Sequence, residues 1–420
     1  SPQGARRASP ERRLGISAMA LRLWDTASRD SKDFEPGPIV TMYVCGITPY
    51  DSTHLGHAAT YLTYDLLIRR LEDLGHEVRM VRNVTDVDDS ILPKARELGI
   101  PYLELAEAEL KRFRRDMRQL GMRPAFAEPR ATETIDRIIE LVEQLLDSGH
   151  AYLTAGTAYF DVSTAPNFGD LSHYPRDQML RLARARGGNP DDPHRRDPLD
   201  FVLWQPSLAD EPAWRAPFGV GRPGWHIECS AMATQELGET IDLHGGGTDL
   251  IFPHHECEIA QSEAITGKPF VKHWLHSAMV AYEGEKMSKS LGNLVFVSDL
   301  LEQADPRAIR LALMHHHYRS GFEWHDTGIQ DGTALLHRLL AAAQASGNPD
   351  PAPFAERVRA SLDNDLDAPT ALEALDDLAS AILSDGSEGS DSAAVQELCS
   401  LSALIGVDLS TPFSIGAIAL

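Results

Sequence analysis

The sequence has 420 residues, 43% hydrophobic content and a formal net charge of −23. This length predicts two or three domains, and no apolar run approaches the ~20 residues that span a bilayer. The acidic balance argues against a broad nucleic-acid-binding face, because phosphate neutralisation supplies most of the affinity for nucleic acid. We therefore expect no membrane partner and no nucleic-acid partner.

The N-terminus and the cysteines indicate the cellular compartment. Residues 1–18 are basic and polar and lack the apolar core of a secretory signal, so they predict a disordered extension before Met19. The chain has four cysteines, which is few for a disulfide framework at this length. A reducing cytoplasm is the expected location, where thiols near histidines become candidate metal ligands. We expect a monomer.

A strand, a helix and a second strand open the folded part. Residues 38–45 alternate and are β-prone, residues 54–75 have helical apolar spacing and end at Gly75, and residues 76–84 read as a second strand. Because such a unit joins parallel strands, the sequence predicts an α/β fold with a parallel sheet.

The rest of the chain predicts an insertion, a return to the sheet and a helical end. Residues 92–120 and 131–149 read as helices, whereas residues 150–222 are irregular, rich in Pro, Gly and Arg, and read as inserted loops. The sheet resumes with a strand at 240–247, a helix at about 254–267 and a strand at about 271–277. Helices are expected over 296–345 and then, after a Pro-rich joint, to about 407.

The first candidate motif is His54-Leu55-Gly56-His57, between the first strand and the first helix. A nucleotide lying on this turn needs a residue without a side chain beneath it, and helix N-terminal amides favour phosphate. Both imidazoles can donate to phosphate oxygens. Taken alone, this pattern is equally well explained by two surface histidines at a helix start.

The second motif runs from Lys286 to Ser290, with the sequence KMSKS. Lys286 and Lys289 on a polar loop suit the β- and γ-phosphates of ATP in a transition state. An isolated KxxK is better explained as a solvated loop. The two motifs together, in this order and in this strand–helix context, favour nucleotide chemistry.

This motif pair resembles that of class I aminoacyl-tRNA synthetases, and the intervening text resembles cysteinyl-tRNA synthetase. The matching segments include YVCGITPYD, NVTDVDDS, GRPGWHIECSAM, DLHGGGTDLIFPHHECEIAQ and EKMSKSLGN, and the similarity runs from about residue 21 to 407. It implies a Rossmann-like catalytic domain over 19–295 with an insertion at about 92–222. A helical stem-contact region over 296–345 and a short C-terminal helical domain over 346–420 would follow.

Cys45, Cys229, His254 and Glu258 are candidate zinc ligands by residue type. His254 and Glu258 are spaced i, i+4 and would share a helix face, but the four are scattered, and a buried cysteine with a capping histidine is the plain alternative. The resemblance implies that they bind zinc, which would select the thiol of cysteine over the hydroxyl of serine. Cys257 would point away from His254, Cys399 would lie in the core, and consecutive His315, His316 and His317 would point in different directions.

The resemblance also implies residues that line a cysteinyl-adenylate. These are Cys45, Gly46, Ile47, Thr48, Thr60, Asn83, Val84, Thr85, Trp225, Gly247, Thr248, Asp249 and Val280. Asp249 would accept from the ribose hydroxyls, since a carboxylate can accept from two donors. A core indole explains Trp225 equally well, and a strand-end turn explains Asn83 and Thr85.

Further text resembles a relative of the synthetase, the cysteine:glucosaminyl-inositol ligases of mycothiol biosynthesis. It includes STHLGHAATYLTYD and the Arg186–Pro190 segment RGGNP, which departs from the ligases' RGGDP at Asn189. The last seventy residues are acidic, and Glu258 is a feature of the synthetase. The resemblance implies that ATP with Mg²⁺ activates cysteine, which then passes to the amine of the amino-sugar. A truncated cysteinyl-tRNA synthetase and a non-catalytic paralogue are the alternatives.

Overall fold

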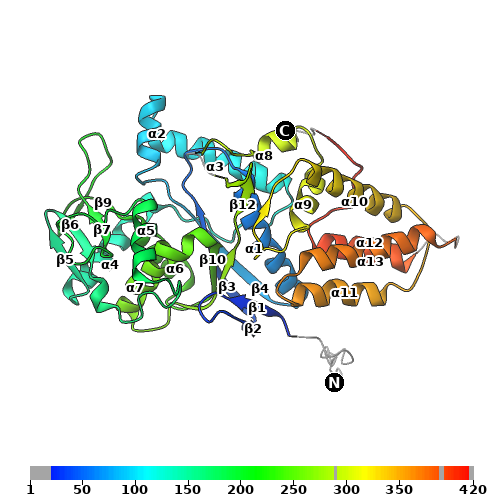
Figure 1. Cartoon of the computed structure of the whole chain (residues 1–420), viewed down its shortest axis with the longest axis horizontal. Helices are drawn as coiled ribbons and strands as arrows, with labels where there is room; N and C mark the ends of the chain where they lie inside the picture. The colour runs from blue at the N-terminus through cyan, green and yellow to red at the C-terminus, as the bar shows by residue number, and fades with distance from the viewer. Residues whose placement is uncertain (1–19, 288–290, 387–391, 416–420) are drawn as a thin grey trace, which may run out of the picture.

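The computed structural model describes residues 20–287, 291–386 and 392–415. The expected extension, residues 1–18, lies outside the described residues. The molecule is elongated, with one β-rich lobe, a central sheet and a helical lobe in a row (Figure 1). A hairpin of β1 (Arg22–Asp25) and β2 (Asp30–Asp33), which sequence patterns did not predict, lies beneath the central sheet.

The central sheet has the strand order β11-β10-β3-β4 and is parallel throughout. Its strands are β3 (Ile39–Ile47), β4 (Glu77–Val84), β10 (Ile241–Gly247) and β11 (Val271–Ser277). Val40, Met42 and Val44 are buried, and α1 (Leu55–Asp73) returns the chain from β3 to β4. The predicted α/β fold with a parallel sheet is therefore confirmed, and the carboxyl ends of β3, β4 and β10 meet at one edge.

Residues after β4 first form helices and then a second sheet. The helices are α2 (Ile91–Leu98), α3 (Tyr102–Gln119) and α4 (Ile135–Asp147). The apolar spacing predicted a single helix over 92–120, but Gly99 ends α2 with a left-handed backbone and Pro101 caps the start of α3. The second sheet is antiparallel, with the order β5-β6-β7-β9-β8, and α5 (Arg176–Ala185) lies between β6 and β7 in the chain. Its strands are β5 (Ala151–Thr154), β6 (Thr157–Phe160), β7 (Phe201–Gln205), β8 (Trp214–Ala216) and β9 (Gly219–Pro223).

The expectation of irregular loops over 150–222 is therefore wrong. These strands are only three to five residues long, and β7 pairs with β9 rather than with β8, the next strand in the chain. Short strands of this kind give little periodic signal, and Pro and Gly mask it further. The buried aromatics Phe160, Phe201 and Trp204 form part of a separate hydrophobic core for this lobe.

The chain then returns to the central sheet through α6 (Trp225–Leu237), a π-helical turn over Ile251–His255 and α7 (Glu256–Thr266). The helical lobe contains α9 (Pro306–Met314), α10 (Thr327–Ala343), α11 (Ala352–Asp363), α12 (Ala368–Ser384) and α13 (Ala393–Leu404). Three short strands, β12 (Val280–Tyr282), β13 (Glu285–Lys286) and β14 (Phe322–Glu323), form a small sheet, and α8 (Val297–Leu301) and α9 lie between β13 and β14 in the chain.

A buried ion pair joins the helical lobe to the central sheet layer. Arg310 of α9 pairs with Asp65 of α1 at 2.5 Å and also donates to the carbonyl of Ile405 beyond α13. One hydrophobic core runs through α1, α9, α10, α12 and α13, so these helices fix the position of α1. The exact domain boundaries stay a prediction. Among the described residues, no helix combines the length and apolar content that a membrane crossing requires.

Candidate active site

Four residues from separate segments bring metal-type donor atoms together. Cys45 is near the end of β3, Cys229 is in α6, His254 is in the π-helical turn and Glu258 is in α7. Their donor atoms all lie within 4.8 Å of one another, and all four residues are buried. The His254 Nε2 atom lies 3.0 Å from the Glu258 carboxylate, as the i, i+4 spacing predicts, although His254 precedes α7 rather than belonging to it.

Burial sets the protonation states in this group. It lowers the pKa of His254 well below its ordinary value, so the imidazole is neutral, the form that ligates metals. It raises the pKa of the Cys45 thiol and of the Glu258 carboxyl, because a buried anion without a compensating cation is costly. A divalent cation would supply that positive charge, so the donor set fits a metal ion.

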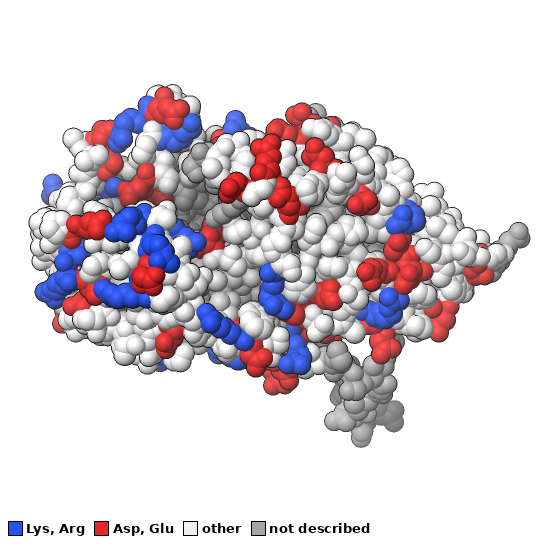
Figure 2. Space-filling view, in the orientation of Figure 1, with Lys and Arg blue, Asp and Glu red and all other residues white. Residues whose placement is uncertain are grey.

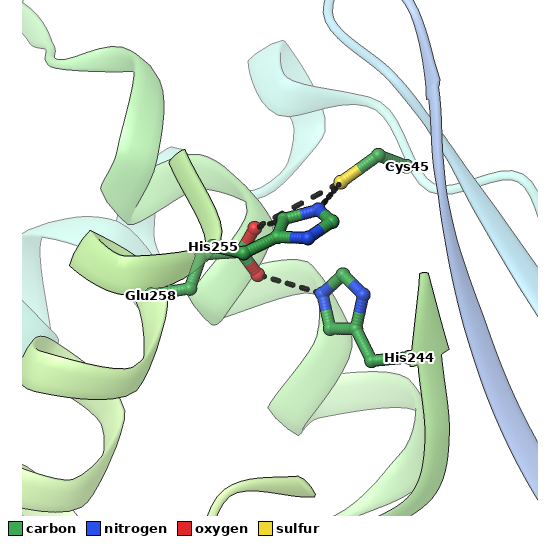
Figure 3. Close-up of side chains that lie close together, drawn as sticks. All are labelled: Cys45, His244, His255 and Glu258. Carbon is green, nitrogen blue, oxygen red and sulfur yellow. Dashed lines mark hydrogen bonds and ion pairs between the residues drawn. The ribbon is translucent and has the colours of Figure 1, made fainter. Parts of the chain in front are cut away.

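A second group shares Cys45 and Glu258 but adds His244 and His255 (Figure 3). His244 of β10 lies 2.9 Å from one Glu258 oxygen, and the His255 Nε2 atom lies 3.2 Å from the Cys45 sulfur. Sequence reasoning missed both histidines. Two features of the sequence could have indicated them. His244 lies in the predicted strand segment DLHGGG, where it is buried in the sheet, and His255 directly follows His254 in PHHEC.

A large cavity separates the central sheet from the β-rich lobe, and we call it the insertion chamber. It has a volume of about 680 Å³. Thr48, Trp225 and Asp249 line one side, and Tyr159, Arg186 and Asn189 line the other. The Trp225 ring stacks on the His254 ring with centroids 4.1 Å apart. The first donor group therefore lies directly behind the chamber wall.

A second cavity, of about 400 Å³, lies at the start of α1, and we call it the HxGH cavity. Its lining includes Gly46, Ile47, Thr48, His54 and His57. The His54 and His57 rings stack with centroids 3.7 Å apart and cap the helix. A Cβ on Gly56 would come within 3.0 Å of the His54 ring, which gives this glycine a structural reason in addition to the predicted nucleotide contact.

The segment after KMSKS is hydrogen-bonded to the HxGH turn. The Leu55 amide donates to the Val295 carbonyl at 2.8 Å, and the Val297 amide donates to the Thr53 carbonyl at 3.0 Å. Lys286 ends β13, where its backbone pairs with Ala281. Lys289 and the side chain of Lys286 lie outside the described residues. The structure thus brings the flanks of the two predicted motifs side by side.

Backbone geometry at the strand ends explains several predicted residues. A Cβ on Gly46 would lie 1.7 Å from the Asn83 carbonyl oxygen, so only glycine fits between β3 and β4. The Asn83 side chain accepts from the Gly46 amide at 2.7 Å and donates to the Thr85 hydroxyl at 2.9 Å. Asn83 and Thr85 therefore act at least as a strand-end turn.

The remaining predicted residues fall into two kinds. Val84 and Val280 have buried side chains in the main core, so only their backbones can face a ligand. Thr60 accepts from the Ser277 hydroxyl at 3.0 Å, and Gly247 immediately precedes the 3-10 turn formed by Thr248, Asp249 and Leu250.

Other cysteines and histidines, which we considered from the sequence but did not predict to be metal ligands, lie apart from the donor groups. Cys257 packs in the core of the β-rich lobe, and Cys399 packs against the main core. His316 stacks on Phe322 with centroids 3.8 Å apart. None of these three belongs to either donor group found among the described residues.

This fold and site define a class of protein, and comparison with known proteins specifies it further. Residues 33–334 match the family model described as "tRNA synthetases class I (C) catalytic domain". Among solved structures, Mycobacterium tuberculosis methionyl-tRNA synthetase with methionyl-adenylate superposes with a TM-score of 0.62 at 18% identity, covering 87% of this chain and 89% of that one. The Thermus thermophilus arginyl-tRNA synthetase gives 0.52 at 15% identity, over 89% and 82%. These likenesses show the class I synthetase fold.

Curated relatives are much closer in sequence. The L-cysteine:1D-myo-inositol 2-amino-2-deoxy-alpha-D-glucopyranoside ligase of Thermobispora bispora is 47% identical over 94% of this chain and 98% of its own length. The ligase of the same name from Gordonia bronchialis is 48% identical over 94% and 97%. The chain therefore belongs to this ligase family within the class I synthetases.

Proposed function

We propose that this chain joins L-cysteine to the amine of 1D-myo-inositol 2-amino-2-deoxy-α-D-glucopyranoside, using ATP and releasing AMP and pyrophosphate. The observation that carries the proposal is the near-full-length identity to ligases of that name, 47% over 94% of the chain. The buried donor group behind Trp225 supports the choice of cysteine, since thiolate is a good metal ligand.

Zinc is the metal that we assign to Cys45, Cys229, His254 and Glu258. This group has two thiols, and α6 carries both Cys229 and the chamber residue Trp225. The second ring nitrogen of His254 lies 2.9 Å from His226, which orients the imidazole from behind. When bound, zinc supplies a Lewis-acidic position that holds the cysteine thiolate and discriminates against serine.

The first step forms cysteinyl-adenylate. A carboxylate oxygen of cysteine bonds to the α-phosphorus of ATP, and the bond from that phosphorus to the bridging oxygen breaks. ATP enters this step as its Mg²⁺ complex, and pyrophosphate is the leaving group. His54 and His57 line the HxGH cavity, where they can donate to the leaving phosphates beside the α1 N-terminus. Lys286 and Lys289 are assigned to the same charge from the sequence motif.

The adenylate would lie along the strand ends, between the two cavities. We assign the backbone at Cys45, Gly46, Ile47 and Thr48 to its centre, Trp225 to the cysteine side chain and Asp249 to the ribose. Thr60, Asn83, Val84, Thr85, Gly247, Thr248 and Val280 complete the assignment. Thr48 borders both cavities, which supports an adenylate carbonyl close to it.

The second step would take place on the chamber side. The amine nitrogen bonds to the adenylate carbonyl carbon, the bond from that carbon to the phosphate oxygen breaks, and the nitrogen loses a proton. The HxGH cavity is assigned to the phosphates of ATP. The insertion chamber is therefore the cavity through which we expect the acceptor to approach. Its lining offers donors and acceptors for a polyol, such as Arg186, Asn189 and Gln205.

The distribution of basic residues disfavours tRNA as the acceptor. Residues 346–420 contain two basic residues, Arg357 and Arg359. Arg357 pairs with Asp377, and Arg359 pairs with Asp73 and Glu397. On the face shown in Figure 2, basic side chains over α5 and the helical lobe are interspersed with acidic ones. A tRNA would need phosphate contacts over a long track.

Single-turnover transfer from pre-formed cysteinyl-adenylate tests the proposal. With radiolabelled cysteine, we expect the amino-sugar inositol to take the label as an amide and tRNA to take none. Charging of tRNA without amide formation would assign the chain to the synthetase function. We also place the reaction in the cytoplasm, which agrees with four free thiols, and the expected monomer stays a prediction for light scattering.

A further inference from the structure

Cysteine brings three polar groups to the site, and the residues assigned above account for two of them. The thiol is assigned to the metal group, and the carboxylate reacts at the strand ends. Those residues leave the α-ammonium without an anionic partner. An ammonium removed from water needs hydrogen-bond acceptors, and it gains most from a carboxylate.

Glu228 is a carboxylate with unused acceptor capacity in the right place. It lies in α6, lines the insertion chamber and is only 1% exposed. Its Oε2 atom has no hydrogen-bond partner among the described residues. A buried polar atom left in this way is costly unless a ligand or water satisfies it.

Other carboxylates that line the chamber already have partners. Asp89 pairs with Arg222, Asp192 accepts from the Tyr159 hydroxyl, and Asp200 accepts from the Tyr152 hydroxyl and the Val162 amide. Asp88 accepts from the backbone at the start of α2. Asp249 is assigned to the ribose. Glu228 is thus the lining carboxylate best placed to accept from a ligand.

The helix puts Glu228 beside the two residues that would hold the cysteine side chain. Trp225 lies one helical turn from both Glu228 (i, i+3) and Cys229 (i, i+4) on α6, and Trp225 and Glu228 both line the chamber. In cysteine, two carbon atoms separate the sulfur from the nitrogen. A thiol at the metal group therefore leaves the nitrogen a short distance away, on the side of the chamber wall that Trp225 and Glu228 line.

We propose that Glu228 binds the α-ammonium of the substrate cysteine and is a specificity-determining residue of the first half-reaction. The inference rests on the proposed function, because it takes cysteine as the substrate. It adds a second recognition element, so that the site reads the thiol through the metal and the amine through α6.

The test compares two thiols that differ only in the amino group. Full-length, zinc-loaded protein is titrated calorimetrically with L-cysteine and with 3-mercaptopropionate, which keeps the thiol and carboxylate. For Glu228→Gln we expect cysteine to bind about 10- to 100-fold more weakly, the scale of one charge-assisted hydrogen bond. Binding of 3-mercaptopropionate should stay unchanged, and so should zinc content.

Two further variants separate recognition from structure. Glu228→Asp keeps the charge one methylene further back, so it should weaken cysteine binding selectively but less than Glu228→Gln does. Glu236→Gln makes the same change later on α6, outside the chamber, and should bind both thiols as the wild type does. The wild type itself should prefer cysteine to 3-mercaptopropionate.

Specific results would overturn the inference. Equal weakening for both thiols in Glu228→Gln would mean that Glu228 acts through its neighbour Cys229, and unchanged cysteine binding would mean that Glu228 has no contact with the amine. A wild-type protein that supports no cysteine-dependent ATP–pyrophosphate exchange would instead refute the proposed function, whatever Glu228 does.

Discussion

The two cavities of the candidate active site are formed by different parts of the fold. The HxGH cavity lies at the strand ends and helix start of the central parallel sheet, and a short sequence motif marks it. The insertion chamber takes most of its lining from the antiparallel lobe, where no motif of comparable strength stands out. Under the proposed function, activation and transfer would therefore depend on separate walls, which share Thr48 and Tyr50.

Removing a metal ligand should have the largest effect, because it disturbs the site that both cavities serve. Cys229→Ala removes one of four converging donors. We expect loss of bound zinc and of cysteine activation together, measured by metal analysis and by ATP–pyrophosphate exchange. Cys257→Ala, in the nearby core, is the matched thiol control and should keep its zinc. Full zinc occupancy in Cys229→Ala would exclude this residue as a ligand.

Serine offered as the substrate in place of cysteine tests the same metal group without any mutation of the protein. A pocket that reads one methylene discriminates by only ~1–3 kcal/mol, whereas a site built to bind a specific polar group discriminates by roughly 10⁴-fold. We expect serine exchange to be reduced on that larger scale, measured as the ratio of kcat/KM values. Comparable exchange with both amino acids would show that the metal does not contact the substrate.

On the HxGH side, Lys289→Ala tests whether the motif lysine stabilises the adenylation transition state. We expect exchange to slow by roughly 10²-fold or more, as when one preorganised charge-stabilising group is lost. The KM for cysteine should change little, since Lys289 is assigned to the β- and γ-phosphates of ATP and not to the cysteine. An unaltered exchange rate would indicate that the KMSKS segment is only a solvated loop.

On the chamber side, Arg186→Ala should affect transfer far more than activation. Arg186 lines the chamber and donates to the Phe252 carbonyl. We expect the KM for the amino-sugar to rise about tenfold, the scale of one hydrogen bond to a charged group, with pyrophosphate exchange nearly unchanged. Arg184→Ala is the control, because Arg184 pairs with Asp191 outside the chamber. Equal losses of activation and transfer in Arg186→Ala would contradict the idea that the two half-reactions use separate cavity walls.

How far the sequence predicts this molecule depends on how local the determining interactions are. The strand around Met42 and the helix around Leu62 follow from periodicity over neighbouring residues. The pairing of Trp204 with Pro223 joins short strands that are not consecutive in the chain, so no local pattern reveals it. The α/β fold was therefore predictable, and the antiparallel lobe was not.

The candidate site shows the same limit. Cys45, Cys229, His254 and Glu258 were identified by residue type and family resemblance, and the structure brings them together. Glu228 was missed although it precedes Cys229, because nothing in the letters WHIEC distinguishes a satisfied carboxylate from an unsatisfied one. Only the three-dimensional surroundings show that its Oε2 atom lacks a partner.

The sharing of Cys45 and Glu258 between two donor groups affects how the proposed metal centre should be studied. If His254 is lost, His244 and His255 still stand beside the shared pair, so a variant can retain metal in a different coordination shell. A measurement of metal content alone would then miss the change in coordination. Cobalt(II) substitution is more informative, because the absorption spectrum responds to sulfur ligation. One group offers two cysteine sulfurs and the other offers one, so the spectrum distinguishes a displaced metal from a correctly seated one.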